Sequence, residues 1–400
     1  MDLRSHSPYW LLKSGLPQTY PSLPGNSRVD IAVMGAGISG ALTAWYLAEA
    51  GFKVIVLDKR HAGTGSTAAS TALLQYEIDT PLVKLAARMG EAAAVRAYKL
   101  TAEAISKLEW ISTRVGKQST FTNRPSLQYA SRQSHVKDLR EEFRLRRAHG
   151  FPVYWWDAEK LSSKMGFLAP AGLYSTIGAE LDAYLLTHQL LKKSQHKGAR
   201  IYDNTTVTHI HHDKKGVTLH TDLGFTVKAK ELVIACGYES QRYIPFKVEQ
   251  IHSTYAMVSE PMPGWQSWYR RCLIWETATP YLYLRSTDDK RILVGGLDDD
   301  FYQPDKRDAR ISDKTRRLVA AFHRKFPEIP FRPDFQWAGA FASTKDGLPY
   351  IGAIRQRPHT HFALGFGGNG ITFSVLAAEI IRDTILGKPR IDNNIFSFNR

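Results

Sequence analysis

Three glycines at fixed spacing, Gly35, Gly37 and Gly40, constrain the fold of this chain more than any other feature. They stand between an apolar run at residues 31–34 and an uncharged segment that follows it. In a strand–turn–helix unit, the first glycine allows a tight turn, the second lets the backbone approach a pyrophosphate, and the third lets helix and strand pack closely. The spacing therefore predicts a βαβ unit that binds a dinucleotide.

An acidic residue completes this pattern at the expected distance. Residues 53–57 form a second apolar run that ends at Asp58, about 20 residues after the glycines, where a carboxylate can accept hydrogen bonds from an adenosine ribose. The helix between the two runs begins at Ile38 and Ser39, whose N–H groups have no partner within the helix and favour phosphate oxygens. We place these residues and Lys59 in the predicted site. The pattern alone does not distinguish FAD from NAD.

A membrane span is the main alternative for the same stretch. Residues 31–48 contain no charged side chain and are just long enough to cross a bilayer. Three glycines would weaken such a helix, and an apolar run that ends in an acid is typical of a buried parallel strand. We therefore favour the βαβ unit and expect no transmembrane segment.

The length and charge of the chain limit its class. A chain of 400 residues exceeds the usual size of one domain, so a cofactor domain and a second domain are expected. The formal net charge of +15 also suits a nucleic-acid-binding protein. However, the basic residues are spread along the chain, and the densest run, residues 140–147, includes Glu141 and Glu142. This distribution favours a solvated basic surface that attracts anionic substrates, and nucleic acid is not an expected partner.

The cysteines and the first residues indicate the compartment. Only Cys236 and Cys272 are present, which excludes a disulfide framework and a four-cysteine metal site. Residues 1–27 contain no continuous apolar segment of the kind found in secretory signals. We expect a cytoplasmic protein with reduced thiols and no bound metal ion.

Apolar periodicity divides the rest of the chain into helical and extended parts. Helices are expected at residues 82–114 (as one or two helices), 139–148, 182–195 and 313–325. Asp182 is the expected N-cap of the helix at 182–195. The strands are expected at residues 199–202, 207–212, 216–221, 231–235, 248–260, 280–286 and 291–296. Residues 63–70 are expected to form a polar loop, and the aromatic residues 154–156 and 166–178 to be irregular. Gly237, after an apolar strand, is suited to pass beneath a cofactor where a side chain would collide.

A second cluster of glycines near the C-terminus indicates that the dinucleotide is a flavin. The cluster and the first residues of the predicted helix after it are Gly365, Gly367, Gly368, Asn369, Gly370, Ile371 and Thr372. One dinucleotide needs a single pyrophosphate turn, so a second helix start implies another negative charge. In a flavoenzyme that charge develops on the reduced isoalloxazine ring, around N1 and O2. The two clusters together therefore predict bound FAD.

Five motifs in this order resemble those of the FAD-dependent amino-acid and amine oxidoreductases of the D-amino-acid oxidase superfamily. They are the fingerprint at residues 35–58, Gly65-Ser66-Thr67-Ala68, Ala235-Cys236-Gly237, Asp346-Gly347-Leu348-Pro349, and residues 365–372. The motifs extend over nearly the whole chain, and their order and spacing are more specific than any one of them. The resemblance adds Ser66, Thr67, Val207 and Asp346 to the expected FAD site.

The resemblance implies an α/β fold in which a Rossmann-like FAD-binding domain is interrupted by an α+β substrate domain with a mostly antiparallel sheet. For this chain it implies an FAD-binding domain of residues 27–85, 178–246 and 337–400, a substrate domain of residues 86–177 and 247–336, and an N-terminal extension of residues 1–26. Sarcosine oxidases hold their flavin through a cysteine in a region that matches residues 337–346, which contain no cysteine here. Non-covalent FAD is therefore expected.

The resemblance also implies a substrate-binding arginine. In the superfamily, an arginine on a strand of the substrate sheet forks onto the substrate carboxylate, and Arg285 matches this position. Tyr281 and Tyr283 share its face because side chains alternate along a strand, and Tyr255 is a weaker candidate. The alternative for Arg285 is a surface residue paired with the acidic residues 288–289.

These features imply the oxidation of a C–N bond in an amine or amino acid. The neutral amine of a carboxylate-bearing substrate would lie over the flavin, a hydride would pass from its Cα to N5, and the resulting imine would hydrolyse. Such chemistry requires positioning and a dry cleft rather than a catalytic triad. The electron acceptor would be oxygen in an oxidase, and a quinone or carrier in a dehydrogenase. Two alternatives are oxidation of a wobble-uridine side chain in tRNA and a non-catalytic flavin-binding protein.

Overall fold

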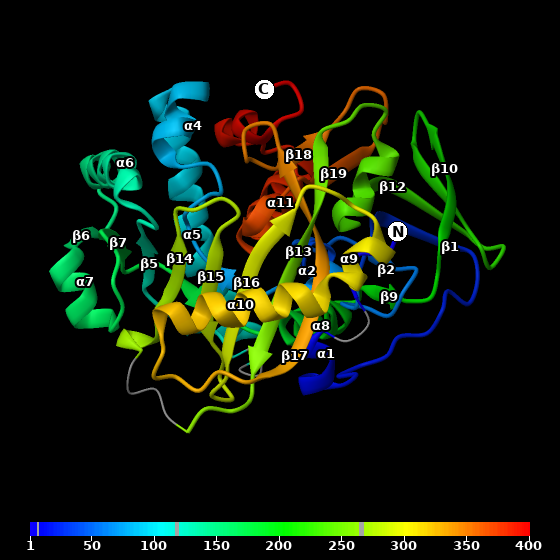
Figure 1. Ribbon diagram of the computed structural model, residues 1–400. Coiled ribbons are helices and arrows are strands. Elements are labelled where there is room, and N and C mark those ends of the chain that lie inside the picture. The colour runs from blue at the N-terminus through cyan, green and yellow to red at the C-terminus, as the bar shows by residue number, and fades with distance from the viewer. Residues whose placement is uncertain (6–7, 117–119, 264–267) are drawn as a thin grey trace.

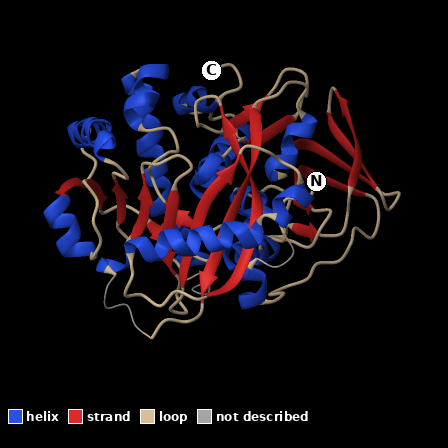
Figure 2. Cartoon of the chain, viewed as in Figure 1, coloured by secondary structure: helices blue, strands red, loops and turns tan. Residues whose placement is uncertain are grey.

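The computed structural model describes residues 1–5, 8–116, 120–263 and 268–400, which form two eight-stranded sheets, a small third sheet and the helices packed on them (Figures 1 and 2). The first sheet contains β1 (Ser27–Met34), β2 (Val54–Leu57), β9 (Arg200–Tyr202), β10 (Val207–Asp213), β11 (Gly216–Thr221), β12 (Thr226–Ile234), β18 (Tyr350–Ala353) and β19 (Thr360–Leu364). The second contains β5 (Ser126–Tyr129), β6 (Val153–Asp157), β7 (Ala171–Ser175), β13 (Glu249–Ser259), β14 (Leu273–Glu276), β15 (Leu282–Ser286), β16 (Ile292–Asp299) and β17 (Pro333–Thr344). The third contains β3 (Leu73–Leu74), β4 (Thr122–Asn123) and β8 (Ala179–Glu180).

Helices lie before, between and after these strands. The α-helices are α1 (Tyr9–Ser14), α2 (Ile38–Glu49), α3 (Ser66–Ala69), α4 (Leu82–Met89), α5 (Glu91–Val115), α6 (Val136–Ala148), α7 (Ala158–Met165), α8 (Ala183–His196), α9 (Pro304–Ala309), α10 (Ile311–Lys325) and α11 (Gly370–Ile385). Two short 3-10 helices matter for the site, η3 (Gly237–Tyr243) and η5 (Gly367–Asn369). Among the described helices, none combines the length and the apolar character needed to cross a bilayer.

The first sheet has a parallel centre. Strands β12, β1, β2 and β9 run parallel side by side, β19 also pairs in parallel with β12, and β10, β11 and β18 add antiparallel pairs. In β1, Ile31 and Val33 join the core on one face, whereas Ala32 and Met34 join the core on the other. Because both faces are covered, the strand is apolar at successive positions.

Helix α2 is pressed against the turn that leaves β1. It packs on β1 and contacts both α8 and α11, and its residues 38–48 are all buried. A Cβ atom on Gly40 would lie 1.8 Å from the carbonyl oxygen of Gly35. Gly35 has a φ of 101°, and a Cβ atom there would lie 2.4 Å from the carbonyl oxygen of Ala235. Both glycines are therefore required by close backbone approach.

The second sheet is antiparallel except for the β14–β5 pair. Helix α10 lies across it, as the yellow helix at the front of Figure 1 shows. Leu318 and Phe322 of α10 are buried in one core with Met257 and Val294 of the sheet. This core fixes the sheet independently of the first one.

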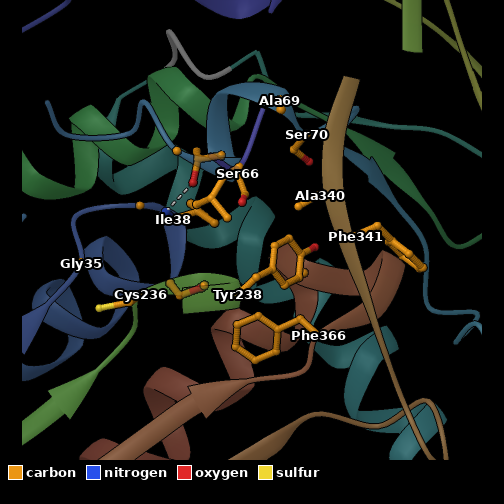
Figure 3. A pocket seen from close by; sticks show the side chains of 18 of the residues that line it. Gly35, Ile38, Ser66, Ala69, Ser70, Cys236, Tyr238, Ala340, Phe341 and Phe366 are labelled. Carbon is orange, nitrogen blue, oxygen red and sulfur yellow. Dashed lines mark hydrogen bonds between the residues drawn. The ribbon is translucent and has the colours of Figure 1, made fainter. Parts of the chain in front are cut away.

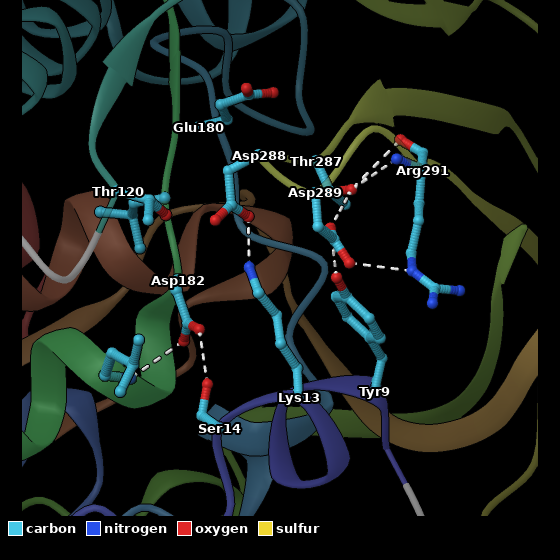
Figure 4. Close-up of polar contacts among 12 residues, drawn as sticks. Tyr9, Lys13, Ser14, Thr120, Glu180, Asp182, Thr287, Asp288, Asp289 and Arg291 are labelled. Carbon is cyan, nitrogen blue, oxygen red and sulfur yellow. Dashed lines mark hydrogen bonds and ion pairs between the residues drawn. The ribbon is translucent and has the colours of Figure 1, made fainter. Parts of the chain in front are cut away.

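The N-terminal segment ties α1 to the edge of the second sheet (Figure 4). The hydroxyl of Tyr9 donates to Asp289 Oδ1 at 2.5 Å, and Lys13 forms an ion pair with Asp288. Trp10 is fully buried beside Tyr9. The segment is therefore an integral part of the fold rather than a loose extension.

Most of the predicted elements are confirmed. Residues 82–114 form two helices, α4 and α5, and Asp182 caps α8 by accepting a hydrogen bond from the backbone N–H of Leu185 at 2.9 Å. The expectation of irregular structure at residues 154–156 and 166–178 was wrong, because these segments contain β6 and β7 at the edge of the second sheet. The rings of Trp156 and Tyr174 stack across this pair at 4.6 Å. The expected polar loop contains the short helix α3.

Sheet membership differs from the predicted domain limits at two places. Strand β17 pairs with β13 from Pro333 to Thr344, so a boundary at residue 337 would cut a strand of the second sheet. Helix α5 falls within the range predicted for the substrate domain but packs on α8 and α11 beside the first sheet. The overall prediction of a mixed α/β fold is confirmed.

Replacing Gly40 with Ala is expected to destabilise the protein by at least about 2 kcal/mol, because the new methyl group must displace backbone rather than a flexible side chain. Urea unfolding followed by circular dichroism measures the change. Gly25→Ala is the matched control, since a Cβ atom there meets nothing within 4 Å. Equal stabilities of the two variants would contradict the packing role of Gly40.

Candidate functional site

A deep cavity lies between the two sheets, and residues from both ends of the chain line it (Figure 3). Of the residues predicted to bind the cofactor, those that line it are Gly35, Gly37, Ile38, Ser39, Asp58, Lys59, Ser66, Thr67, Val207, Gly237, Gly365, Gly367, Gly368, Asn369, Gly370, Ile371 and Thr372. Gly40 is not among the lining residues, which agrees with its packing role. The structure thus brings the two glycine clusters together, although more than 300 residues of sequence separate them.

The start of α2 forms one part of the wall. Gly37 is the N-cap of the helix, and the backbone N–H of Ile38 donates to Thr67 Oγ1 at 2.9 Å. A Cβ atom on Gly37 would lie 3.0 Å from the same hydroxyl oxygen. Thr67 therefore positions the helix start, while the Ser66 hydroxyl is buried without a hydrogen-bond partner. An unpartnered hydroxyl and a helix start suit the oxygens of a phosphate.

Asp58 lies beside this turn at the end of β2. Its Oδ2 accepts from the backbone N–H of Ala36 at 2.6 Å, and its Oδ1 accepts from that of Arg60 at 2.8 Å. Burial raises the pKa of Asp58, although both hydrogen bonds favour the charged form. Each carboxylate oxygen can accept a further bond. The residue is thus held in place to receive a hydroxyl group, as predicted for a ribose.

A network of charges surrounds the same end of the cavity. Lys59 Nζ lies 2.7 Å from Glu239 Oε1, and Arg60 Nη1 lies 3.0 Å from Glu239 Oε2. Burial alone would raise the pKa of Glu239, but the hydrogen bonds from Arg60 and Lys59 outweigh it and lower the pKa to about 2. Lys59 therefore lines the cavity as predicted, and Glu239 is a wall residue that sequence reasoning missed.

The second glycine cluster meets the cavity at the start of α11. The backbone N–H of Gly368 donates to Asp79 Oδ2 at 2.7 Å, and a Cβ atom on Gly367 or Gly368 would collide with this carboxylate. The Asn369 side chain donates to the backbone oxygens of Gln75 and Glu77 at 3.1 and 2.8 Å. The loop is therefore fixed by residues 75–79. Nothing in the local sequence around Asp79 indicated this contact.

Asp346 is a correction to the predicted site. Its Oδ1 accepts from the backbone N–H of Leu348 at 3.0 Å, and its Oδ2 pairs with Arg400 at 2.7 Å. It does not line the cavity. Asp346 shapes the turn before β18 and anchors the C-terminal residues instead of contacting a cofactor.

The second sheet forms the opposite wall with tyrosines. Tyr281 and Tyr283 line the cavity as predicted, with their rings 5.7 Å apart. Tyr255 also reaches it, but its hydroxyl donates to Asp299 Oδ2 at 2.9 Å and is not free for a substrate. Tyr238, which was not predicted, lines the same cavity as Ile38 and Ser66 (Figure 3).

Arg285 does not occupy the predicted position. It is 2% exposed and lies outside the cavity lining, and its Nη1 donates to the backbone oxygens of Ala72 at 2.6 Å and Leu181 at 3.1 Å. Its guanidinium lies 5.3 Å from the centre of the Trp10 ring. The surface alternative also fails, since Asp288 pairs with Lys13 and Asp289 with Arg291. Binding of a substrate carboxylate by Arg285 stays a prediction that this geometry does not support.

The donor set of the cavity fits FAD. Two helix starts face one space, Asp58 stands where a ribose hydroxyl is expected, and the buried Ser66 hydroxyl has no partner within the protein. The glycine backbones leave room where side chains would collide with neighbouring atoms. Residues 337–346 contain no cysteine, in agreement with non-covalent binding.

Comparison with known proteins gives one consistent result. A sequence model described as "FAD dependent oxidoreductase" matches residues 30–384. The chain is 25% identical over 377 residues to glycine oxidase of Geobacillus kaustophilus, a match that spans 90% of this chain and 93% of the relative. It is 25% identical over 417 residues to gamma-glutamylputrescine oxidoreductase of Escherichia coli, spanning 95% and 89% of the two chains.

A solved structure supports the same fold. The crystal structure of glycine oxidase from Geobacillus kaustophilus superimposes with a TM-score of 0.80 at 22% sequence identity, covering 94% of this chain and 99% of that one. The family model spans far more than half of the sequence, and the cavity carries the elements expected for the cofactor. This chain belongs to the FAD-dependent oxidoreductase family of D-amino-acid oxidase type.

Proposed function

We propose that this FAD-dependent oxidoreductase oxidises the C–N bond of an amine or amino acid. The observation that carries the proposal is the shared cavity, in which two glycine-rich helix starts face a wall of tyrosines from the second sheet. The relatives support the same chemistry, because their names include glycine oxidase and gamma-glutamylputrescine oxidoreductase. The proposed product is an imine that hydrolyses in water.

The residues that line the cavity would bind the cofactor and position the substrate. The bound FAD supplies the acceptor for a hydride from the substrate carbon. The start of α2 would hold the pyrophosphate, Asp58 would hold the ribose, and the start of α11 would favour negative charge on the flavin side of the cavity. Nothing in this scheme needs a protein side chain to act as a strong acid or base.

The tyrosine wall supplies uncharged hydrogen-bond donors. Burial raises the pKa of Tyr281 and Tyr283 well above the ordinary tyrosine value, so both stay protonated at neutral pH. Their rings line the cavity, and the hydroxyl of Tyr281 can orient a substrate, whereas the hydroxyl of Tyr283 also has side-chain hydrogen bonds with Thr71 and Thr254. We propose these two residues, and not Tyr255, as the substrate-facing members of the predicted set.

Anaerobic mixing of the FAD-loaded protein with a panel of amines and amino acids tests the proposal. We expect at least one member to bleach the flavin absorbance near 450 nm. A flavin that no member reduces, in protein that dithionite still reduces, would instead support a non-catalytic flavin-binding protein. Peroxide release on admission of air would identify oxygen as the acceptor, and its absence would favour a quinone or carrier.

Asp58→Ala is expected to raise the dissociation constant of FAD at least about tenfold, because it removes the ribose acceptor together with the partner of two backbone N–H groups. Quenching of flavin fluorescence on titration of the apoprotein measures the constant. Glu328→Ala, at an exposed position, is the control. Unchanged affinity in Asp58→Ala would remove this residue from the site.

A further inference from the structure

The cavity wall formed by the second sheet carries an acidic residue where a carboxylate-binding cation was expected. Among the described lining residues, the cations are Lys59, Arg60 and Arg242, which come from the loop after β2 and from η3. The second sheet contributes Asp298 as its charged lining residue. A substrate anion would therefore meet like charge on this wall.

A β-bulge turns Asp298 toward the cavity. Ser253 pairs with Asp299 and Tyr255 pairs with Gly296, so Leu297 and Asp298 together face the single residue between those two on β13. Leu297 adopts a φ of 56°, a left-handed conformation that is unfavourable for a leucine. Bulges redirect side chains and often lie beside active sites.

Among the described residues, the Asp298 carboxylate has no cationic hydrogen-bond donor, whereas that of its neighbour Asp299 has one. Asp299 accepts from Tyr255 at 2.9 Å and from Lys314 Nζ at 2.7 Å. In contrast, Asp298 has a side-chain hydrogen bond with Thr254 but no cationic hydrogen-bond donor, and its Oδ1 is buried without a hydrogen-bond partner. A buried acceptor without a donor is costly, so a donor supplied by a ligand would stabilise it.

Two tyrosines of the cavity wall, Tyr281 and Tyr283, lie near enough to this carboxylate to interact with it electrostatically. The Tyr283 ring lies across Gly295 on the next strand, where a Cβ atom would lie 2.3 Å from the ring. Burial and the nearby charges of Asp79 and Asp298 raise the pKa of Tyr281. Carboxylates and aromatic faces together form the environment that proteins use to bind ammonium groups.

We propose that Asp298, together with Tyr281 and Tyr283, binds a cationic nitrogen of the substrate other than the amine that is oxidised. The substrate class is then a diamine or a polyamine derivative. This proposal rests on the proposed oxidation of amines, in which the reacting amine is neutral while the second nitrogen stays protonated. The guanidinium of Arg285 is held by two backbone oxygens and does not line the cavity.

Equilibrium titration calorimetry tests this preference on FAD-loaded protein that dithionite has reduced, because a reduced flavin accepts no hydride, under anaerobic conditions with three ligands of one chain length. The ligands are 1,4-diaminobutane, n-butylamine and 4-aminobutanoate, which place an ammonium, a methyl group and a carboxylate at the far end. We expect the diamine to bind at least 10-fold more tightly than butylamine, and 4-aminobutanoate to bind most weakly. Binding of 4-aminobutanoate that equals or exceeds that of the diamine would overturn the proposal.

The variant Asp298→Asn tests whether Asp298 is the residue that binds the second ammonium group. It keeps the size of the side chain, and we expect it to lose at least 10-fold in diamine affinity while butylamine binding and FAD content stay unchanged. Asp305→Asn, at an exposed position of α9, is the control and should behave as the native protein. An equal loss for both ligands in Asp298→Asn would show a general disturbance and contradict the proposal. If Asp298→Asn fails to fold, the three-ligand series on the native protein still tests the preference for a second ammonium group.

The two proposals fail separately. Diamine binding that depends on Asp298, in a protein whose flavin no amine reduces, would overturn the oxidation and leave the cation site. If amines or amino acids reduce the flavin but a second ammonium group does not tighten binding, the cation site would be overturned and the oxidation would stand.

Discussion

The contact between the start of α2 and the turn after β1 determines what the rest of the molecule can do. The carbonyl oxygen of Gly35 occupies the space of a side chain at Gly40, and the carbonyl of Ala235 occupies that of a side chain at Gly35. These approaches bring β1, β12 and α2 to one point. Thr67 accepts from the N–H of Ile38, and the absence of a side chain at Gly37 leaves the rest of the helix start open to the cavity.

The two ends of the cavity are lined by different kinds of side chain. At the end near Asp58, Lys59 and Arg60 pair with Glu239, and the wall is rich in fixed charge. At the other end the second sheet contributes Tyr281, Tyr283 and a carboxylate. A single long ligand would therefore pass from a polar pocket suited to phosphates and a ribose to an aromatic one suited to chemistry on an amine. In the proposed function, the flavin and its substrate would share the cavity in this way.

Local sequence predicted the parts of the site that depend on local geometry. The two glycine clusters and Asp58 follow from spacing within short segments, and all of them except Gly40 line the cavity. Tyr281 and Tyr283, which also line it, followed from strand alternation around the position that the family resemblance gave for Arg285. The position of Arg285 could not be predicted in this way, because it depends on backbone oxygens at Ala72 and Leu181 and on a tryptophan of the N-terminal segment. Chain topology brings these groups together.

Asp79 and Asp298 illustrate the same limit. Asp79 contacts a glycine almost 300 residues away in sequence, and the two aspartates at residues 298 and 299 look alike until the bulge sends one toward Lys314 and the other toward the cavity. Strands β6 and β7 were missed because their aromatic residues pair with each other at a sheet edge, without alternation of apolar and polar positions.

The N-terminal residues have a consequence for how the cofactor enters. Leu3 lines the cavity, and its carbonyl oxygen accepts from Ala340 N–H of β17 at 2.8 Å, while Ser5 N–H donates to Ala338 at 2.9 Å. The same stretch is also held by an ion pair between the Met1 amino group and Glu239 and by one between Asp2 and Arg307, so it closes part of the wall around the cavity firmly. A flavin that entered or left past Leu3 would have to break these backbone and ionic contacts first.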